Sequence, residues 1–212
     1  NVIELGVPFS DPMADGIVIQ RSSQRALDKG VNLGRVLSLA ASLRTSSEVP
    51  IVLFSYLNPI LRFGVEELCT AAKTSGVDGI LIVDAIDEEA RGLADAFAKH
   101  DISLISLVSP TTTEERLESI CRRARGFIYA VSRAGVTGAS GANSSEAENL
   151  AARVRKFTDL PIAVGFGIST AEQVENVWRF ADAAVVGSAI VAEIEASIAA
   201  GDIGRASCRE RV

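Results

Sequence analysis

Carboxylates cluster near the start of the chain, where they could move protons. Glu4 interrupts an apolar, β-rich run at residues 2–7, and Asp11 and Asp15 follow it in a loop of turn-forming residues. A glutamate in a strand that is buried on both faces needs a partner or a function. Burial raises the pKa of such a carboxyl group, which suits proton transfer near neutral pH. Glu4 is therefore a candidate acid–base residue, and an ion-paired strand residue is the alternative.

Glycine-rich segments follow the later apolar runs and could bind a phosphate group. They lie at residues 135–138, 165–169 and 187–188, and in the last of them Ser188 opens a helix. Glycine lets backbone N–H groups approach a phosphate, and the positive end of a helix dipole adds attraction. In (β/α)₈ barrels, phosphate sites form from the loops after the last two strands. The sequence therefore predicts phosphate binding at these segments.

Apolar, β-branched runs alternate with helical patterns along the chain, which predicts βαβ units and a parallel sheet. Capping-box pairs mark expected helix starts at residues 112–115, 145–148 and 169–172. The later strands recur at roughly 22–35 residues, near the spacing of a (β/α)₈ barrel, and a doubly wound open sheet is the alternative. The expected strands are 2–7, 51–56, 79–83, 102–108, 127–131, 162–166 and 183–186.

The composition is that of an ordinary globular protein. Of 212 residues, 48% are apolar and 23% are charged, and the net charge of −6 argues against a nucleic-acid partner. No apolar run reaches the ~20 residues of a membrane span, and no signal-peptide pattern appears. Cys69, Cys121 and Cys208 lie far apart without metal-binding spacing, which fits free thiols in a reducing compartment. We therefore expect a cytoplasmic protein.

Both ends of the sequence have unusual features. The chain starts at Asn1, already inside an expected strand, and residues 203–212 lack apolar periodicity. That decapeptide is what one reading frame of a common sequencing adapter would encode. We expect a single truncated barrel domain at residues 1–202, with seven of eight strands and the first strand missing, followed by a non-native tail at 203–212.

Together these stretches resemble the tryptophan synthase alpha subunit family. The signature is residues 4–16, and residues 56–59, 132–138, 165–169 and 187–191 agree in the same order. The resemblance implies a (β/α)₈ barrel that cleaves indole-3-glycerol phosphate to indole and glyceraldehyde 3-phosphate in tryptophan biosynthesis. It also implies that the indole passes to a beta subunit in an α2β2 complex. No cofactor is implied for this chain, because pyridoxal phosphate belongs to the beta subunit.

The resemblance also implies roles for individual residues. Glu4 is similar to the family's acid–base residue, and Asp15 to the carboxylate that binds the indole N–H and stabilises the positive indolenine. Asp11, Pro12 and Asn58 lie in segments that face the beta subunit in the family, although a capping or turn role explains Asp11 and Asn58 equally well. The residues expected to bind substrate are Phe54, Tyr56, Tyr129, Thr137, Gly138, Phe166, Gly167, Gly187 and Ser188.

The sequence departs from the family pattern at two places. Ile17 stands where the signature has proline, and residues 84–86 read Asp-Ala-Ile where the family has Asp-Leu-Pro or Asp-Val-Pro. Both departures lie near the partner-facing surface, and Asp84 either orients loop groups or leads a helix. The alternative functions are a stand-alone indole-releasing lyase and a non-catalytic, phosphate-binding activator of the beta subunit. A sugar-phosphate isomerase on the same fold would need a different base at another strand end.

Overall fold

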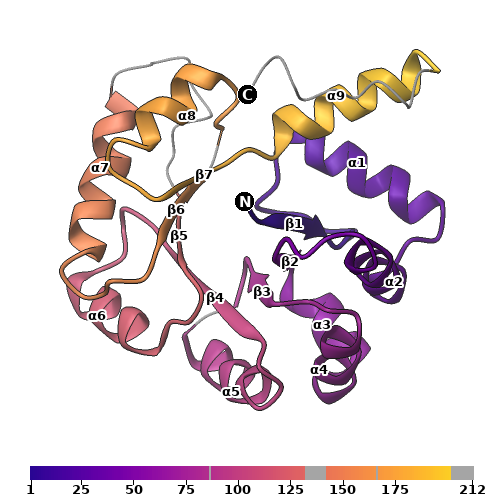
Figure 1. Cartoon of the computed structure of the whole chain (residues 1–212), viewed down its shortest axis with the longest axis horizontal. Coiled ribbons are helices and arrows are strands. Elements are labelled where there is room, and N and C mark those ends of the chain that lie inside the picture. Colours follow the sequence, from indigo (N-terminus) through magenta and orange to yellow (C-terminus); the bar gives the residue numbers. More distant parts are fainter. Residues whose placement is uncertain (86, 132–141, 166, 202–212) are drawn as a thin grey trace. The chain divides into compact units, whose positions relative to one another are not determined.

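The computed structural model describes residues 1–85, 87–131, 142–165 and 167–201, and its strands all run parallel in chain order (Figure 1). The predicted α/β class and the predicted strands are confirmed to within two residues at each end. The chain forms two compact units, Asn1–Ile105 and Ser106–Val212, while the expectation of one domain at 1–202 stays a prediction. The strands are β1 (Ile3–Gly6), β2 (Ile51–Ser55), β3 (Gly79–Ile82), β4 (Ser103–Val108), β5 (Ile128–Val131), β6 (Ile162–Gly165) and β7 (Ala183–Val185).

In the first unit, β1 pairs with β2, β2 with β3, and β3 with the start of β4. Alternate residues of a strand point to opposite faces of the sheet. Leu5, Ile51 and Leu53 pack into the core beneath the helices. Glu4 and Phe54 must therefore point to the opposite face, away from that core.

The helices of the first unit lie on one side of its strands (Figure 1). In α2 the apolar residues recur at helical spacing, so that Val36, Leu37 and Ala40 are buried in the core. The thiol of Cys69, from α4, is fully buried in the same core. The helices are α1 (Ile17–Asp28), α2 (Leu33–Arg44), α3 (Leu57–Phe63), α4 (Val65–Thr74) and α5 (Asp87–Ala98).

The second unit repeats the strand–helix alternation. Residues 106–108 of β4 pair with β5, β5 with β6, and β6 with β7. Its core holds Leu117 and Cys121 of α6, Leu150 of α7 and the helix-facing residues of β5 and β6. The helices are α6 (Glu114–Arg123), α7 (Ala142–Val154), α8 (Ala171–Val177) and α9 (Ser188–Ala199).

The predicted helix starts are each displaced. The N-cap of α6 is Thr113 rather than Thr112, because the Thr112 hydroxyl instead accepts the backbone N–H of Ser109 at 3.0 Å. The capping box of α8 joins Thr170 to Gln173, one residue beyond the predicted pair. Helix α7 begins at Ala142, so the predicted cap at residue 145 lies inside the helix.

An arginine–aspartate pair joins α2 to the starts of two strands. The Arg44 guanidinium donates to the carbonyl of Gly76 at 2.6 Å, to that of Val49 at 2.9 Å and to Asp78 Oδ2 at 2.6 Å. The same Asp78 oxygen accepts the backbone N–H of Ile51, at the start of β2, at 2.8 Å. This set of bonds, which we call the first clamp, fixes α2, β2 and β3 together at the amino ends of the strands.

The second unit contains the same arrangement. Arg155, just after α7, donates to the carbonyl of Leu160 at 2.8 Å and to the Asp182 carboxylate. Asp182 Oδ2 accepts the N–H of Ile162, at the start of β6, at 2.7 Å. Each arginine stands six residues before a Pro-Ile pair that starts a strand, at residues 50–51 and 161–162. We call this the second clamp.

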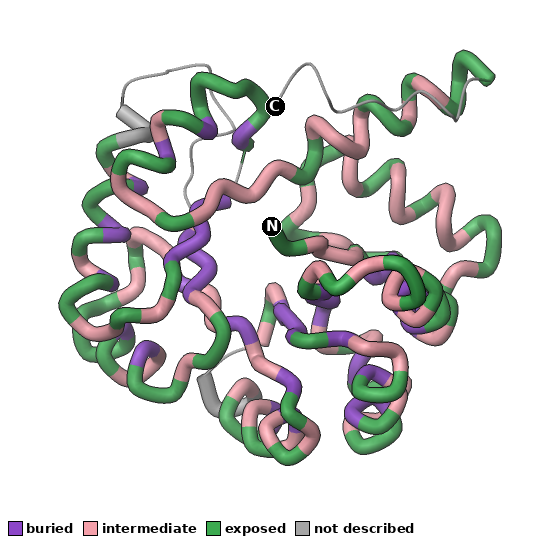
Figure 2. The backbone as a smooth tube through the Cα atoms, viewed as in Figure 1, coloured by how far each residue is buried: buried purple, intermediate pink, exposed green. Residues whose placement is uncertain are grey.

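Burial is uneven among the helices. Buried residues lie along β2 and β3 in the first unit and along β5 and β6 in the second, whereas α1 and α9 contain none (Figure 2). Among the described residues, no helix is both long and apolar enough to cross a membrane.

Candidate active site

Glu4 lies in β1, directly beside Val52 of β2. It is half-buried, on the face of the sheet that is turned away from the helix-covered core. Burial raises the pKa of Glu4 to about 7, because the charged carboxylate loses hydration there. A carboxyl group with this pKa exchanges its proton readily near neutral pH, as a general acid–base residue must.

Asp15 lies in the loop between β1 and α1, and its backbone is fixed on both sides. Its N–H donates to the carbonyl of Pro12 at 3.1 Å, and its carbonyl accepts Gln20 Nε2 of α1 at 2.8 Å. Burial raises the pKa of the Asp15 carboxyl, and a hydrogen bond from the side chain of Tyr56 partly offsets that rise. The Asp15 carboxylate is therefore held against the carboxyl end of β2.

Tyr56 is the N-cap residue of α3 and is only 3% exposed. Its hydroxyl oxygen accepts the backbone N–H of Ala14 at 3.0 Å, and the hydroxyl also hydrogen-bonds the Asp15 carboxylate. Its ring packs against Phe9, with centroids 5.2 Å apart. Burial, together with the negative charges of Asp15 and Asp84, raises the pKa of Tyr56 to about 12.

The other residues expected to face the partner, and Asp84, follow the carboxyl ends of the strands. Asp84 Oδ1 accepts the N–H of Leu57 at 2.7 Å, so this carboxylate caps α3 and orients the residue after Tyr56. Asn58 is exposed in the first turn of α3. Asp11 is also exposed, and its carboxylate accepts the hydroxyl of Ser10 at 2.6 Å. Pro12 is half-buried in the same loop.

Tyr129 occupies, in the second unit, the position that Glu4 occupies in the first. Both residues are the second residue of their strand and point away from the helix-covered core. Tyr129 is buried, and its ring lies over Gly165 at the carboxyl end of β6. A Cβ atom added at Gly165 would stand 2.3 Å from the Tyr129 hydroxyl oxygen. Gly165 was not among the expected site residues, although it belongs to one of the glycine clusters.

Those glycines of the expected phosphate site that the structure describes lie in the second unit. Gly167 is exposed with a φ of +73°, a backbone conformation that glycine adopts without strain. Gly187 is the N-cap residue of α9, and Ser188 is the first residue of that helix; both are exposed. The remaining expected site residues, Thr137, Gly138 and Phe166, lie outside the described residues, as does Ile86.

Phe54 and two further residues complete the described site. Phe54 is half-buried near the carboxyl end of β2, beside Gly6 and Leu81 in the neighbouring strands. Sequence reasoning missed Phe9 and Gln20, which contact Tyr56 and Asp15. Their signal was faint, because Phe9 lies inside the signature at 4–16 and Gln20 is one polar residue in a helix.

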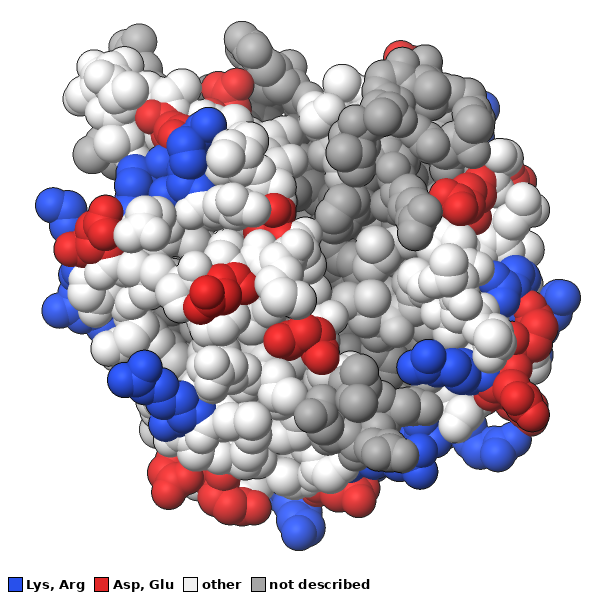
Figure 3. Space-filling model, turned by 180° about the vertical axis from the view of Figure 1, so that it is seen from behind, with Lys and Arg blue, Asp and Glu red and all other residues white. Residues whose placement is uncertain are grey.

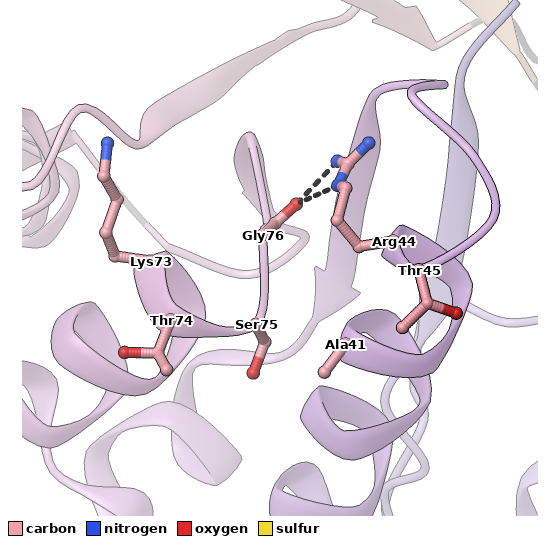
Figure 4. Close-up of a pocket in the computed structure, with 7 residues that line it drawn as sticks. All are labelled: Ala41, Arg44, Thr45, Lys73, Thr74, Ser75 and Gly76. Carbon is pink, nitrogen blue, oxygen red and sulfur yellow. Dashed lines mark hydrogen bonds between the residues drawn. The ribbon is translucent and has the colours of Figure 1, made fainter.

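A cavity of about 250 Å³ in the first unit lies away from these residues (Figure 4). Lys73 and Arg44 contribute to its wall, at the carboxyl ends of α4 and α2. The Arg44 guanidinium is already occupied by the first clamp, and the Lys73 ammonium pairs with Asp101 at 3.1 Å. The cavity therefore lies at the amino ends of the strands, whereas Asp15 and Tyr56 lie at their carboxyl ends.

Neither the charges on the face drawn in Figure 3 nor the grouping of acidic side chains points to a nucleic-acid or metal site among the described residues. Acidic and basic side chains are interspersed over the described part of the face in Figure 3, with no broad basic surface of the type that nucleic acid requires. Within the described ranges, no three His, Cys, Asp or Glu side chains are grouped so that they could hold a metal ion.

Parallel strands in chain order, each followed by a helix, are the connectivity of the (β/α)₈-barrel proteins, with one strand fewer. A half-buried carboxyl group whose pKa is raised to about 7 is typical of barrels that catalyse proton transfer. A family profile described as tryptophan synthase alpha chain matches residues 1–209. The chain belongs to the tryptophan synthase alpha chain family.

Individual relatives agree over most of the chain. The tryptophan synthase alpha chain of Desulfosudis oleivorans is 49% identical over 203 residues, which cover 96% of this chain and 77% of that protein. The Thiobacillus denitrificans protein of the same name is 52% identical over 196 residues and 72% of its length. A solved structure of the Pyrococcus furiosus alpha-subunit superposes with a TM-score of 0.84 at 40% identity, covering 92% of this chain and 79% of that one. The Legionella pneumophila subunit alpha gives 0.85 at 38% identity, covering 94% and 74%. The fold is thus the family's (β/α)₈ barrel, of which the described residues form seven strands.

Proposed function

We propose that Glu4 and Asp15 carry out the reaction of this family of lyases, the cleavage of indole-3-glycerol phosphate to indole and glyceraldehyde 3-phosphate. The observation that supports this most strongly is the Glu4 carboxyl, whose pKa of about 7 lets it hold or release a proton at neutral pH. Asp15 supplies a second carboxylate in a different environment, at the carboxyl ends of the strands. Two carboxyl groups with separated pKa values can take different protonation states in one site.

The reaction needs two proton transfers around one carbon–carbon bond. Protonation of indole C3 converts the ring into an indolenine, whose electron demand breaks the bond to the side chain. The adjacent side-chain hydroxyl loses its proton and becomes the aldehyde of glyceraldehyde 3-phosphate. We assign these transfers to Glu4, and to Asp15 the hydrogen bond from the indole N–H, which carries positive charge in the indolenine.

The remaining expected residues would bind the rest of the substrate. We propose that Tyr129 and Phe54 contact the substrate from β5 and β2, and that Gly167, Gly187 and Ser188 bind the phosphate. The N–H groups at the start of α9 and the conformational freedom of Gly167 support this assignment. We extend the proposal to Thr137, Gly138 and Phe166 from the resemblance alone.

We also propose that the chain works with a tryptophan synthase beta subunit in the cytoplasm. Membership of the family supports this partnership. Asp11, Pro12 and Asn58, in the segments that follow the carboxyl ends of β1 and β2, are the proposed contacts. The alpha chain itself would need no pyridoxal phosphate, because the partner would carry it.

Indole release from indole-3-glycerol phosphate tests the proposal, measured with and without an added beta subunit. Glu4→Gln and Asp15→Asn should each lower kcat by about 10²- to 10⁴-fold, because each removes a charge-bearing group from the transition state. Glu172→Gln, an exposed glutamate on α8, is the matched control and should leave the rate unchanged.

Each outcome assigns the chain to one function. Slow release that the beta subunit accelerates supports the two-subunit enzyme, whereas fast release without it indicates a stand-alone lyase. Release that survives Glu4→Gln would make the catalytic assignment wrong. Activation of the beta subunit without any indole release would indicate a non-catalytic phosphate-binding protein.

A further inference from the structure

Tyr56 lies where a substrate-lining residue was expected, yet its polar atom is already engaged within the protein. The hydroxyl oxygen accepts the N–H of Ala14 at 3.0 Å. A phenolic hydroxyl carries one proton, and acceptance of the Ala14 N–H leaves that proton available to the Asp15 carboxylate, which is its other partner. Both bonds join the end of β2 to the loop that carries Asp15. Ala14, in that loop, lies 42 residues before Tyr56 in the sequence.

We propose that Tyr56 is the positioning residue of Asp15: it holds the carboxylate in one orientation and keeps it ionised for the indole N–H. This inference rests on the proposed role of Asp15. The ring packing against Phe9, with centroids at 5.2 Å, fixes the plane of the phenol. The Asp84 cap on the N–H of Leu57, at 2.7 Å, fixes the backbone immediately after it. Both the ring and the adjacent backbone of Tyr56 are therefore fixed, and with them the position of the hydroxyl.

The chemistry of the pair favours one direction of hydrogen bonding. The phenol of Tyr56 stays protonated throughout the neutral range, because burial and the charges of Asp15 and Asp84 disfavour the phenolate. A neutral phenol that donates to a carboxylate favours the ionised carboxylate, which opposes the burial of Asp15. Gln20 bonds the backbone carbonyl of Asp15, whereas Tyr56 bonds its carboxylate.

The kinetic test is Tyr56→Phe, which keeps the ring packing on Phe9 and removes only the hydroxyl. We expect kcat for indole release to fall about 10- to 100-fold, as for loss of a hydrogen bond to a charged group. Because the pKa of Asp15 should rise when the donor is lost, the acidic limb of the kcat profile should move to higher pH. Asp95→Asn, at an exposed aspartate of α5, is the control and should leave that limb in place.

A second variant separates this inference from the proposed function. In an Asp15→Asn background, Tyr56→Phe should cost little further activity, because the carboxylate it orients is already gone. If Asp15→Asn and Glu4→Gln abolish indole release but Tyr56→Phe leaves rate and pH profile unchanged, the positioning role is overturned and the catalytic proposal stands. If Asp15→Asn is fully active, the proposed role of Asp15 is wrong and the role of Tyr56 falls with it.

A direct measurement does not depend on activity. The chain has two tyrosines, so incorporation of 3-fluorotyrosine gives two ¹⁹F resonances, which Tyr56→Phe or Tyr129→Phe assigns. The Tyr56 resonance should shift as Asp15 titrates, and that step should disappear in Asp15→Asn while it persists in Glu4→Gln. A Tyr56 resonance with the same titration curve in wild type and Asp15→Asn would overturn the proposal.

Discussion

At the scale of single residues, Glu4 couples function to stability. The carboxyl group sits in a strand where its charged form is poorly hydrated, and its pKa rises from 4.5 to about 7. The native state therefore binds this proton more tightly than the unfolded chain does. The stabilising contribution is fully present below about pH 4.5, where both states are protonated, and it is lost as the pH rises through about 7.

Glu4→Gln should remove this pH dependence. The amide is neutral at every pH, so the variant should be more stable than the wild type above pH 7, by up to about 3 kcal/mol for a shift of this size. Half-burial reduces the expected gain. Thermal unfolding between pH 5 and pH 8 measures it, and parallel curves for the two proteins would contradict the burial of the charge.

Gly165 shows how a small residue creates space for a large one. The Tyr129 ring occupies the volume in which a side chain at residue 165 would lie, so the two positions are coupled. The sequence placed both residues near a glycine-rich segment, but their contact spans two strands and no local pattern encodes it.

Gly165→Ala should displace Tyr129 and raise the KM for indole-3-glycerol phosphate. Overpacking of this kind costs about 1–3 kcal/mol of unfolding free energy. Gly92→Ala is the matched control, because Gly92 lies exposed in α5 with open space around it, where alanine should be neutral or stabilising by up to about 1 kcal/mol. Equal stability and KM for both variants would contradict the close contact.

For the site, the sequence predicted which residues and segments take part, but not the hydrogen bonds between them. Glu4 was predictable because a carboxylate inside an apolar strand is conspicuous. The engagement of the Tyr56 hydroxyl by Ala14 and Asp15 was not, because it depends on the path of a loop between β1 and α1. Tertiary hydrogen bonds of this kind leave no periodicity in the sequence.

At the scale of helices and strands, each clamp joins three elements with one carboxylate. Asp78 accepts both a backbone N–H of β2 and a guanidinium of α2, so its removal leaves two donors without that acceptor. The Asp182 carboxyl serves the same two purposes, and its pKa is lowered chiefly by the Ile162 N–H and further by Arg155. The stability that Asp182 supplies is therefore present above its ordinary pKa of 3.8 and lost as the pH falls through the lowered value.

Asp78→Ala and Asp182→Ala should each destabilise the protein by about 1–3 kcal/mol, as expected for unsatisfied partners of a charged hydrogen-bond acceptor. Solvent screening should place both effects at the lower end, because the Asp78 and Asp182 side chains are 55% and 47% exposed. Glu118→Ala breaks an exposed i, i+4 pair with Arg122 and is the control, with an expected cost below about 0.5 kcal/mol. Denaturant unfolding measures all three, and equal effects would contradict the clamp.

The strands were more predictable than the helix starts. Continuous apolar runs define the strands because both of their faces are covered. Helix starts depend on which of several adjacent hydroxyls caps the first turn, as Thr112 and Thr113 illustrate. No start was predicted for helix α1, because its N-cap residue is Gly16 and no side chain caps its first turn.

At the scale of the whole molecule, the same pattern of bonds recurs in the two units. The N–H groups of Ile3 and Ile128 bond the carbonyls of Pro50 and Pro161, each at 2.9 Å, and a clamp follows in both units. Glu4 and Tyr129 come one residue after those two isoleucines. The same backbone arrangement thus presents a carboxyl group in the first unit and an aromatic ring in the second.

Met13 is the most exposed large apolar side chain among those described, at 88%, and it lies between Asp11 and Asp15 in the proposed partner-facing loop. Methionine is enriched at protein interfaces. Met13→Ser should weaken binding to the beta subunit about 10-fold without changing the rate of indole release by the alpha chain alone. Leu39→Ser, on an exposed turn of α2, is the control for loss of an exposed apolar group. Calorimetric titration with the beta subunit measures both, and equal affinities would contradict the contact.

Each unit has one buried cysteine whose reactivity can report the opening of that unit. Cys69 lies in the core of the first unit and Cys121 in that of the second, so a thiol reagent reaches either one only when its surroundings open. In a Cys208→Ser background, the labelling rates of these two thiols would time the opening of each unit separately. Two native side chains would then reveal whether the two units open together or in turn.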